Sequence, residues 1–186
     1  MGAHPQEAAL VRAAKQGDRE SFAELARHYQ GPLYGFCYWN LRTRQDAEDA
    51  VQATLLKALE YLDQLEDDTR FRPWLYRIAT NVCLAEHRRA GRLSPLPDDD
   101  GPAPLADGGP APTEALRRRE IREALQRAMG TLSPIQREAL WLFHFEQLPY
   151  ASICDTLGIR PATARKRVFD AVERLRHELQ AYRSLL

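Results

Sequence analysis

The most informative side chains of this sequence are cationic and lie near its carboxyl-terminal end. A short apolar segment ends at Leu157-Gly158, and a longer amphipathic segment begins at Pro161. The polar and basic residues around its start are Arg160, Thr163, Arg165, Lys166 and Arg167. Arginine and lysine pair with guanine edges and with phosphates, and the second helix of a helix-turn-helix places its first residues in the major groove. A basic face can also be simply solvated, but with this frame DNA binding is the favoured interpretation.

A second candidate surface lies on the segment 71–92. Four side chains recur there at helical spacing beside an apolar stripe: Arg77, Asn81, Leu84 and Arg88. Cationic side chains beside aromatic ones suit an unpaired nucleic-acid strand, because each base stacked on an aromatic ring contributes about 1–3 kcal/mol. The alternative is plain packing. Trp74 lies on the apolar stripe and is expected in the core, whereas for Arg70, Phe71 and Asn81 both interpretations stay open.

A run of acids opens an earlier amphipathic segment, which reads Asp46-Ala47-Glu48-Asp49-Ala50-Val51-Gln52. Acids near a helix start are stabilised by the positive end of the helix dipole. On the residues alone this explanation is preferred. The alternative is a docking face for a basic protein partner.

Signals of catalysis are poor. No Gly-rich phosphate loop and no nucleophile elbow occur, and the five histidines show no metal-ligand spacing. We therefore expect no catalytic residue, no metal and no cofactor. The three cysteines, Cys37, Cys83 and Cys154, are odd in number and far apart in the sequence. They argue against a disulfide framework and for a reducing, cytoplasmic compartment.

Length and composition narrow the class of protein. The chain has 186 residues, of which 44% are apolar and 28% charged, and this suits one large or two small globular domains. The longest purely apolar run, residues 139–143, is far too short to cross a bilayer. No charged-then-apolar leader opens the sequence. We therefore expect neither membrane insertion nor export.

The net charge of zero conceals a segmented chain. Residues 1–93 carry 13 basic and 13 acidic side chains, residues 94–112 carry no base and four acids, and residues 113–186 carry 13 bases and nine acids. The middle segment also holds six of the twelve prolines. Such a segment buries too little apolar surface to offset the conformational entropy that it would lose on ordering. It is therefore predicted to be a flexible linker. The sequence therefore predicts two small domains, one on each side of the linker. The linker would allow them to dock at sites tens of Å apart.

Hydrophobic periodicity predicts helices throughout and no strand. The stripes of the first domain fall near residues 9–14, 22–37, 46–62 and 71–85, with Gly31-Pro32 marking a break or kink. In the second domain we expect helices over about 113–129, 133–146 and 150–157, and from Pro161 onward. The predicted fold class is all-α: a bundle of about four helices and a helix-turn-helix domain.

These motifs resemble the extracytoplasmic-function sigma factors, the minimal two-domain initiation factors of bacterial transcription. The matching segments are residues 22–25 with 33–36, 46–54, 71–81, and 132–137 with 148–167. They cover almost the whole chain, in the order and spacing of the family. The domains are then sigma region two at 1–93, the linker at 94–112 and sigma region four at 113–186.

The resemblance implies partners for each surface. Asp46, Asp49 and Gln52 would grip the clamp of core RNA polymerase. The loop 63–71 and the following helix would capture an unstacked base of the unpaired non-template strand at the downstream (minus-ten) promoter element. The residues assigned to that surface are Arg70, Phe71, Arg77, Asn81 and Arg88. The last helix would bind the upstream (minus-thirty-five) element as duplex DNA, and family members are commonly held inactive by an anti-sigma protein.

The last helix departs from the family pattern. Arg160 precedes the proline, Ala164 replaces a usual valine, and Lys166 replaces a usual small polar residue. DNA binding is still expected, but the preferred bases are left open. Two other functions are weighed against a sigma factor: a stand-alone helix-turn-helix regulator that works without polymerase, and a helical adaptor that touches no nucleic acid.

Overall fold

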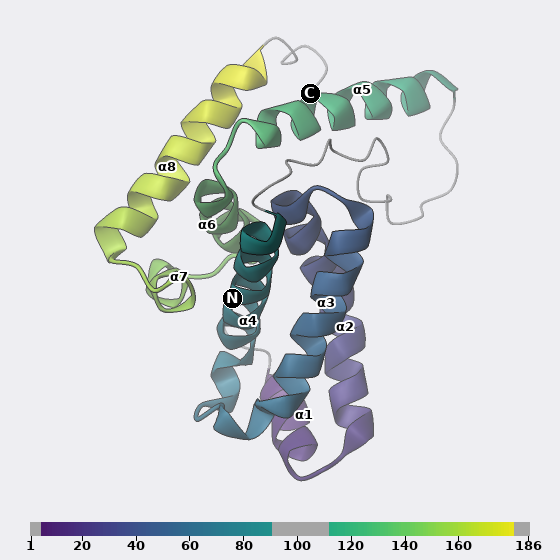
Figure 1. Ribbon diagram of the computed structural model, residues 1–186, viewed down its shortest axis with the longest axis vertical. Helices are drawn as coiled ribbons and strands as arrows, with labels where there is room; N and C mark the ends of the chain where they lie inside the picture. Colours follow the sequence, from purple (N-terminus) through teal and green to yellow (C-terminus); the bar gives the residue numbers. More distant parts are fainter. Residues whose placement is uncertain (1–4, 91–111, 181–186) are drawn as a thin grey trace.

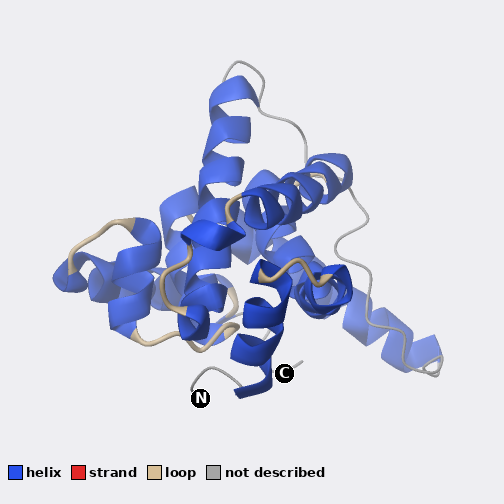
Figure 2. Cartoon of the chain, turned by 90° about the horizontal axis from the view of Figure 1, so that it is seen from below, coloured by secondary structure: helices blue, strands red, loops and turns tan. Residues whose placement is uncertain are grey.

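Apolar residues at helical spacing build the α-helices of the computed structural model, which describes residues 5–90 and 112–180 (Figures 1 and 2). In chain order the elements are α1 (Pro5–Lys15), α2 (Arg19–Leu41), α3 (Arg44–Glu60), the 3-10 turns η1 (Leu62–Gln64) and η2 (Asp68–Arg70), α4 (Phe71–Ala90), α5 (Pro112–Gly130), α6 (Pro134–His144), α7 (Tyr150–Leu157) and α8 (Pro161–Glu178). We call α1–α4 the amino-terminal half and α5–α8 the carboxyl-terminal half. The two described ranges contain no strand, and the all-α prediction is confirmed.

Helix α2 runs without a break through Gly31-Pro32, where the sequence predicted a break or kink. A proline inside a helix costs one backbone hydrogen bond. The inward face nevertheless packs on both sides of it, because Tyr29 is 2% exposed and Leu33 and Phe36 are fully buried. Tertiary packing therefore keeps the helix continuous across a local breaker.

The carboxyl-terminal half begins and ends its helices where the sequence predicts. Ser133 and Gln136 form a reciprocal capping box at the start of α6, and the Gln136 side chain accepts a hydrogen bond from the Ser133 N–H at 3.0 Å. Gly158 ends α7 with a φ of 62°, and Pro161 is the first residue of α8. The pair α7–α8 is thus a short helix, a tight turn and a longer helix, as in a helix-turn-helix.

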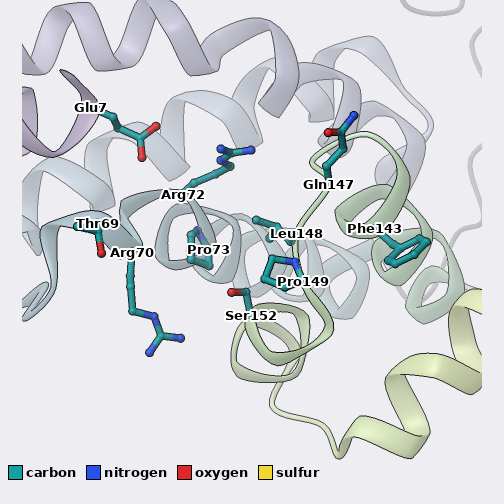
Figure 3. A pocket seen from close by; sticks show the side chains of 10 residues that line it. All are labelled: Glu7, Thr69, Arg70, Arg72, Pro73, Phe143, Gln147, Leu148, Pro149 and Ser152. Atoms are coloured by element: carbon teal, nitrogen blue, oxygen red, sulfur yellow. The ribbon is translucent and has the colours of Figure 1, made fainter. Parts of the chain in front are cut away.

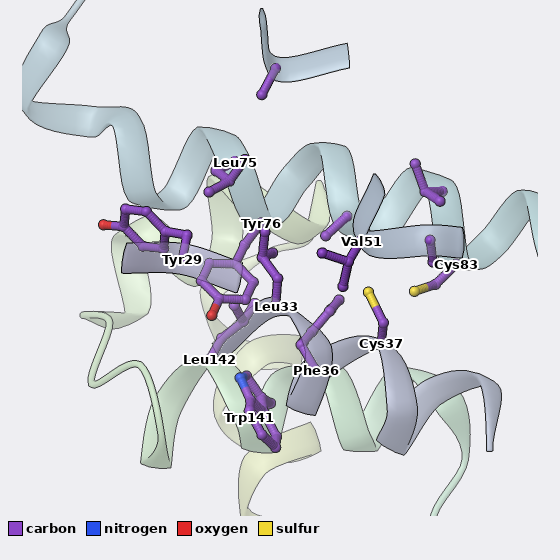
Figure 4. Close-up of a cluster of buried hydrophobic side chains, with 14 of the residues drawn as sticks. Tyr29, Leu33, Phe36, Cys37, Val51, Leu75, Tyr76, Cys83, Trp141 and Leu142 are labelled. Carbon is purple, nitrogen blue, oxygen red and sulfur yellow. The ribbon is translucent and has the colours of Figure 1, made fainter. Parts of the chain in front are cut away.

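Aromatic rings fill the core of the amino-terminal half (Figure 4). Phe36 and Tyr76 are both buried, with ring centres 5.3 Å apart in an edge-to-face arrangement. Cys37 and Cys83, distant in sequence, are both buried there and their thiols are hydrogen-bonded to one another. This contact and burial raise the pKa of the Cys83 thiol. Because both cysteines are buried, neither is accessible in the way that reactive cysteines are.

The two halves share this core, a feature that the prediction of two domains on a flexible linker did not include. Trp141 of α6 is 7% exposed, and its ring centre lies 6.4 Å from that of Phe36. Helix α2 can approach it closely only because residue 35 is glycine. The predicted linker, residues 94–112, lies outside the described residues except for Pro112. Among the described helices none is both long and apolar enough to span a membrane.

Candidate nucleic-acid and polymerase interfaces

Helix α8 turns one face inward and carries the predicted basic residues on the other. Ala164, Val168 and Ala171 are buried against the rest of the carboxyl-terminal half. The predicted site residues Arg160, Thr163, Arg165 and Lys166 are exposed, and Arg167 is half-buried. The Arg165 guanidinium lies 5.7 Å from the centre of the Tyr150 ring on α7, a cation–π contact that orients it beside the turn. Four of the five residues are therefore accessible in the structure, on the outward side and the two flanks of α8.

Arg167 differs from the other four because it lies near a buried carboxyl group. Glu138 of α6 is 8% exposed, and burial raises its pKa to about 7 although the positive charges of Arg167 and Arg137 oppose the rise. Arg137 is itself buried, and desolvation together with Arg42 lowers its pKa to about 10. Part of the charge of Arg167 is thus engaged inside the protein rather than offered to DNA.

Phe169 is a residue of the same surface that sequence reasoning missed. Its side chain is 65% exposed, although phenylalanine is normally buried. The signal was present in the sequence, because residue 169 lies outside the apolar register of 164, 168, 171 and 175. An exposed aromatic beside Lys166 suits an apolar contact with a thymine methyl group in the major groove.

The polar stripe of α4 lies opposite its buried face. Leu75, Ala79 and Val82 are at most 4% exposed. The four side chains that share the outward face are all exposed: Arg77, Asn81, Leu84 and Arg88. The predicted spacing is therefore confirmed as one continuous surface of two guanidinium groups, one amide and one leucine.

Phe71 is a correction to the predicted downstream surface. It is 1% exposed, and its ring centre lies 5.6 Å from that of Tyr29 and 5.9 Å from that of Trp74. Because Phe71 begins α4 on the side that faces α2, its ring fills the core and is closed to a base in this arrangement. The packing alternative holds for Phe71, and Trp74 packs against the core as expected.

Arg70 is exposed, but it forms an ion pair with Asp155 of the helix-turn-helix. Two neighbouring contacts also cross between the halves. The Arg72 side chain donates to the Glu146 carbonyl at 3.0 Å, and the Thr156 hydroxyl donates to the Pro73 carbonyl at 3.1 Å. Together with the contact of Trp141 on α2, these interactions define what we call the seam.

A groove follows the seam on the side of the 70–73 segment (Figure 3). Its lining combines two guanidinium groups with apolar and small polar side chains: Glu7, Thr69, Arg70, Arg72, Pro73, Phe143, Gln147, Leu148, Pro149 and Ser152. In Figure 3 the Arg70 side chain points away from Glu7 and toward the α7 side. Residues of both halves build this groove, so it exists only while the seam is closed.

Helix α3 places the predicted polymerase-binding residues at its amino-terminal end. Thr43 caps the helix by accepting from the Asp46 N–H at 3.1 Å. Asp46 is half-buried, whereas Asp49 and Gln52 are exposed.

Two leucines extend the same outward face along α3, one and two turns beyond Gln52. Leu56 is 68% exposed and Leu59 is 51% exposed. The apolar stripe predicted near residues 46–62 included Leu59 as an inward residue, and the structure corrects this because Leu59 is exposed. An acidic start followed by exposed leucines suits a protein partner better than DNA, because it combines carboxylates with exposed apolar area.

No group of three or more histidine, cysteine, aspartate or glutamate side chains is arranged to hold a metal ion within residues 5–90 and 112–180. A helix-turn-helix with a cationic outward face, a second helix with an arginine and asparagine stripe, and an acidic helix with exposed leucines define the class of the protein. These features are typical of an all-helical DNA-binding protein that also binds a protein partner.

Comparison with known proteins narrows this class. Residues 25–93 match the family model of sigma-70 region 2, and residues 122–175 match that of sigma-70 region 4. The chain is 32% identical over 171 residues to the ECF RNA polymerase sigma factor SigE of Mycolicibacterium smegmatis, covering 91% of this chain and 65% of that protein. It is 32% identical over 184 residues to the RNA polymerase sigma-H factor of Pseudomonas aeruginosa, covering 94% of each.

A solved structure shares the fold. CnrH, in its complex with the cytosolic domain of CnrY, superposes with a TM-score of 0.70 at 22% identity, over 95% of this chain and 98% of that one. The chain belongs to the extracytoplasmic-function group of the sigma-70 family. It is therefore a transcription initiation factor for RNA polymerase and not an enzyme.

Proposed function

We propose that this chain acts in the cytoplasm, binds core RNA polymerase through α3, recognises a promoter in two parts and helps to open it. Residues 1–93 would form the polymerase-binding and melting domain, 94–112 the linker and 113–186 the upstream-reading domain. The observation that carries the proposal is that α3, α4 and α8 each have a buried face and an opposite outward face of different chemistry.

The face of α3 is the proposed contact with the polymerase. Asp46, Asp49 and Gln52 supply acceptors for basic side chains of the clamp, and Leu56 and Leu59 supply apolar area in the same line. Such a composition gives both electrostatic steering and a desolvated centre. In this proposal Asp46 and Asp49 bind basic side chains of the polymerase, in addition to interacting with the helix dipole.

The face of α4 is the proposed contact with the unpaired downstream strand. Arg70, Arg77 and Arg88 would neutralise phosphates, and the Asn81 amide has both a donor and an acceptor for an exposed base edge. Capture of an unstacked base offsets an unstacking free energy of a few kcal/mol. Phe71 supports this surface from inside the core.

The face of α8 is the proposed contact with the upstream duplex. Arg160, Thr163 and Arg165 stand at the amino-terminal end of the helix, where a helix-turn-helix approaches base edges and phosphates. Arg167 would contribute less, because it also faces Glu138.

An anti-sigma protein is a further proposed partner. CnrH, which has the same fold, is known in complex with the cytosolic domain of CnrY. The groove along the seam offers Arg70 and Arg72 beside apolar residues, and a peptide with acidic and apolar side chains would complement it.

Two experiments separate the proposal from its rivals. Co-purification with core polymerase distinguishes a sigma factor from a stand-alone regulator: we expect a complex that Asp49→Arg disrupts, and absence of a complex contradicts the proposal. Replacing Arg165, Lys166 and Arg167 by alanine in the holoenzyme distinguishes DNA binding from an adaptor. If all three contact phosphates, the slope of log binding constant against log salt should fall by about 2–3, and an unchanged slope and unchanged transcription would favour the adaptor.

A further inference from the structure

Lys166 and Asp170 form an ion pair on the outward face of α8. The Lys166 ammonium lies 3.1 Å from an Asp170 carboxylate oxygen, and the two side chains are 75% and 36% exposed. Both residues stand opposite Ala164 and Val168, which are buried. The pair therefore lies on the part of the helix that any bound duplex would meet.

Helix stability does not explain this pair. A lysine four residues ahead of an acid is the weaker of the two orders, and exposed ion pairs of this kind contribute little to folding. The next pair along the helix, Glu173 with Arg176, has the acid first. An isolated acid on a DNA-facing surface would also be repelled by phosphates, so the position of Asp170 requires another reason.

We propose that Lys166 and Asp170 read a guanine and a cytosine in the major groove of the upstream element, an inference that rests on the proposed function. A lysine ammonium donates to guanine O6 and N7, and an aspartate carboxylate accepts from cytosine N4. Residues four apart are separated by about 6 Å along a helix, which corresponds to about two steps of duplex DNA at ~3.4 Å each. The two bases are thus neighbours or next neighbours.

Without DNA the two side chains satisfy one another. On binding, each exchanges its partner for a base edge, and until then Lys166 neutralises the Asp170 charge that phosphates would repel. The pair then contributes specificity more than affinity. A phosphate contact by Lys166 would behave differently, because it would weaken binding to every sequence equally and lower the salt slope by about one.

The test is selection of upstream elements from a randomised duplex by the holoenzyme, with the wild-type chain and with Asp170→Ala, Lys166→Ala and Glu173→Ala. We expect Asp170→Ala to lower the preference for one cytosine by about tenfold, and Lys166→Ala to do the same for a nearby guanine. Glu173→Ala, an exposed acid one turn further on, should leave both unchanged.

Each outcome decides something. If the wild-type holoenzyme enriches an element in which no position responds to Asp170→Ala, the inference is wrong while the proposed function stands. If Lys166→Ala weakens all sequences alike, the lysine binds a phosphate and its half of the inference fails. If no upstream sequence is enriched by any variant, the proposed function itself is contradicted.

Discussion

The indole ring of Trp141 lies directly against Gly35, the residue that lets α6 approach α2. A Cβ atom at position 35 would lie 2.5 Å from Trp141 Cη2 and 2.9 Å from Cζ2. Real Cβ atoms do not come this close, so glycine is required at this position for packing rather than for an unusual backbone. This contact is one of those that tie the carboxyl-terminal half to the core of the amino-terminal half.

Gly35→Ala should therefore destabilise the packing of the halves. Overpacking of this kind costs about 1–3 kcal/mol, and we expect that loss in the free energy of unfolding from urea denaturation. Gly31→Ala is the matched control on the same helix, because nothing lies within 4 Å of its Cβ position. The control should be unchanged or slightly more stable. Equal stability of both variants would contradict the packing described for Trp141.

The exposed leucines of α3 make a second prediction. Replacing Leu56 and Leu59 by serine should weaken binding to core polymerase about tenfold, since apolar anchors at the centre of an interface carry much of its affinity. The free energy of unfolding should change little, because both side chains are exposed. Ile135→Ser, on α6 and 45% exposed, serves as the control. A titration of labelled core polymerase measures all three affinities, and unchanged binding of the leucine variant would remove these residues from the interface.

The outward stripe of α4 predicts a defect in promoter opening rather than in duplex binding. Asn81→Ala should lower the population of open complex about tenfold, because a bidentate pair of hydrogen bonds between an amide and a base edge contributes about 1–3 kcal/mol. Permanganate reactivity of unpaired thymines measures this population, and protection of the upstream duplex should be retained. If upstream protection falls in parallel with opening, Asn81 acts through folding or assembly instead.

The buried carboxyl group of Glu138 predicts a pH dependence of stability. Burial raises its pKa from 4.5 to about 7, so the folded chain holds this proton over a range in which the unfolded chain releases it. The wild-type protein therefore loses stability between about pH 4.5 and 7, by up to about 3 kcal/mol. Glutamine does not titrate, so the unfolding free energy of Glu138→Gln lacks this pH-dependent loss.

The difference in unfolding free energy between Glu138→Gln and the wild type should thus move in favour of glutamine as pH rises through this range. His87, whose pKa burial and Arg137 lower, makes the opposite contribution, but it is present in both proteins and largely cancels. Urea denaturation at several pH values gives the difference directly. A difference that is independent of pH would show that Glu138 is ionised throughout.

The sequence predicted which residues share one side of a helix better than it predicted which segments pack against each other. Periodicity placed Arg77, Asn81 and Arg88 on one stripe, and the structure confirms it, because a helix fixes which residues share a side. The turn at Gly158 and the cap at Ser133 were equally predictable, since both depend on local backbone chemistry.

Features that depend on contacts between distant segments were missed. Phe71 was assigned to DNA, but Tyr29 and Trp74 enclose it, and no local pattern indicates which ring faces a neighbouring helix. Likewise the seam depends on Trp141 meeting Gly35, a pairing of residues more than a hundred positions apart. Periodicity can show that a side chain is apolar and inward, but only the tertiary structure shows what it packs against.

The central claim is that this chain directs core polymerase to particular promoters, and run-off transcription with mapped start sites tests it most directly. Purified core polymerase with the full chain should yield discrete start sites that the core alone does not use. Transcripts should be lost with Asp49→Arg and retained with Glu24→Arg, a control acid on another helix. If the chain gives no start sites beyond those of the core alone, or if Asp49→Arg leaves them unchanged, the account is contradicted.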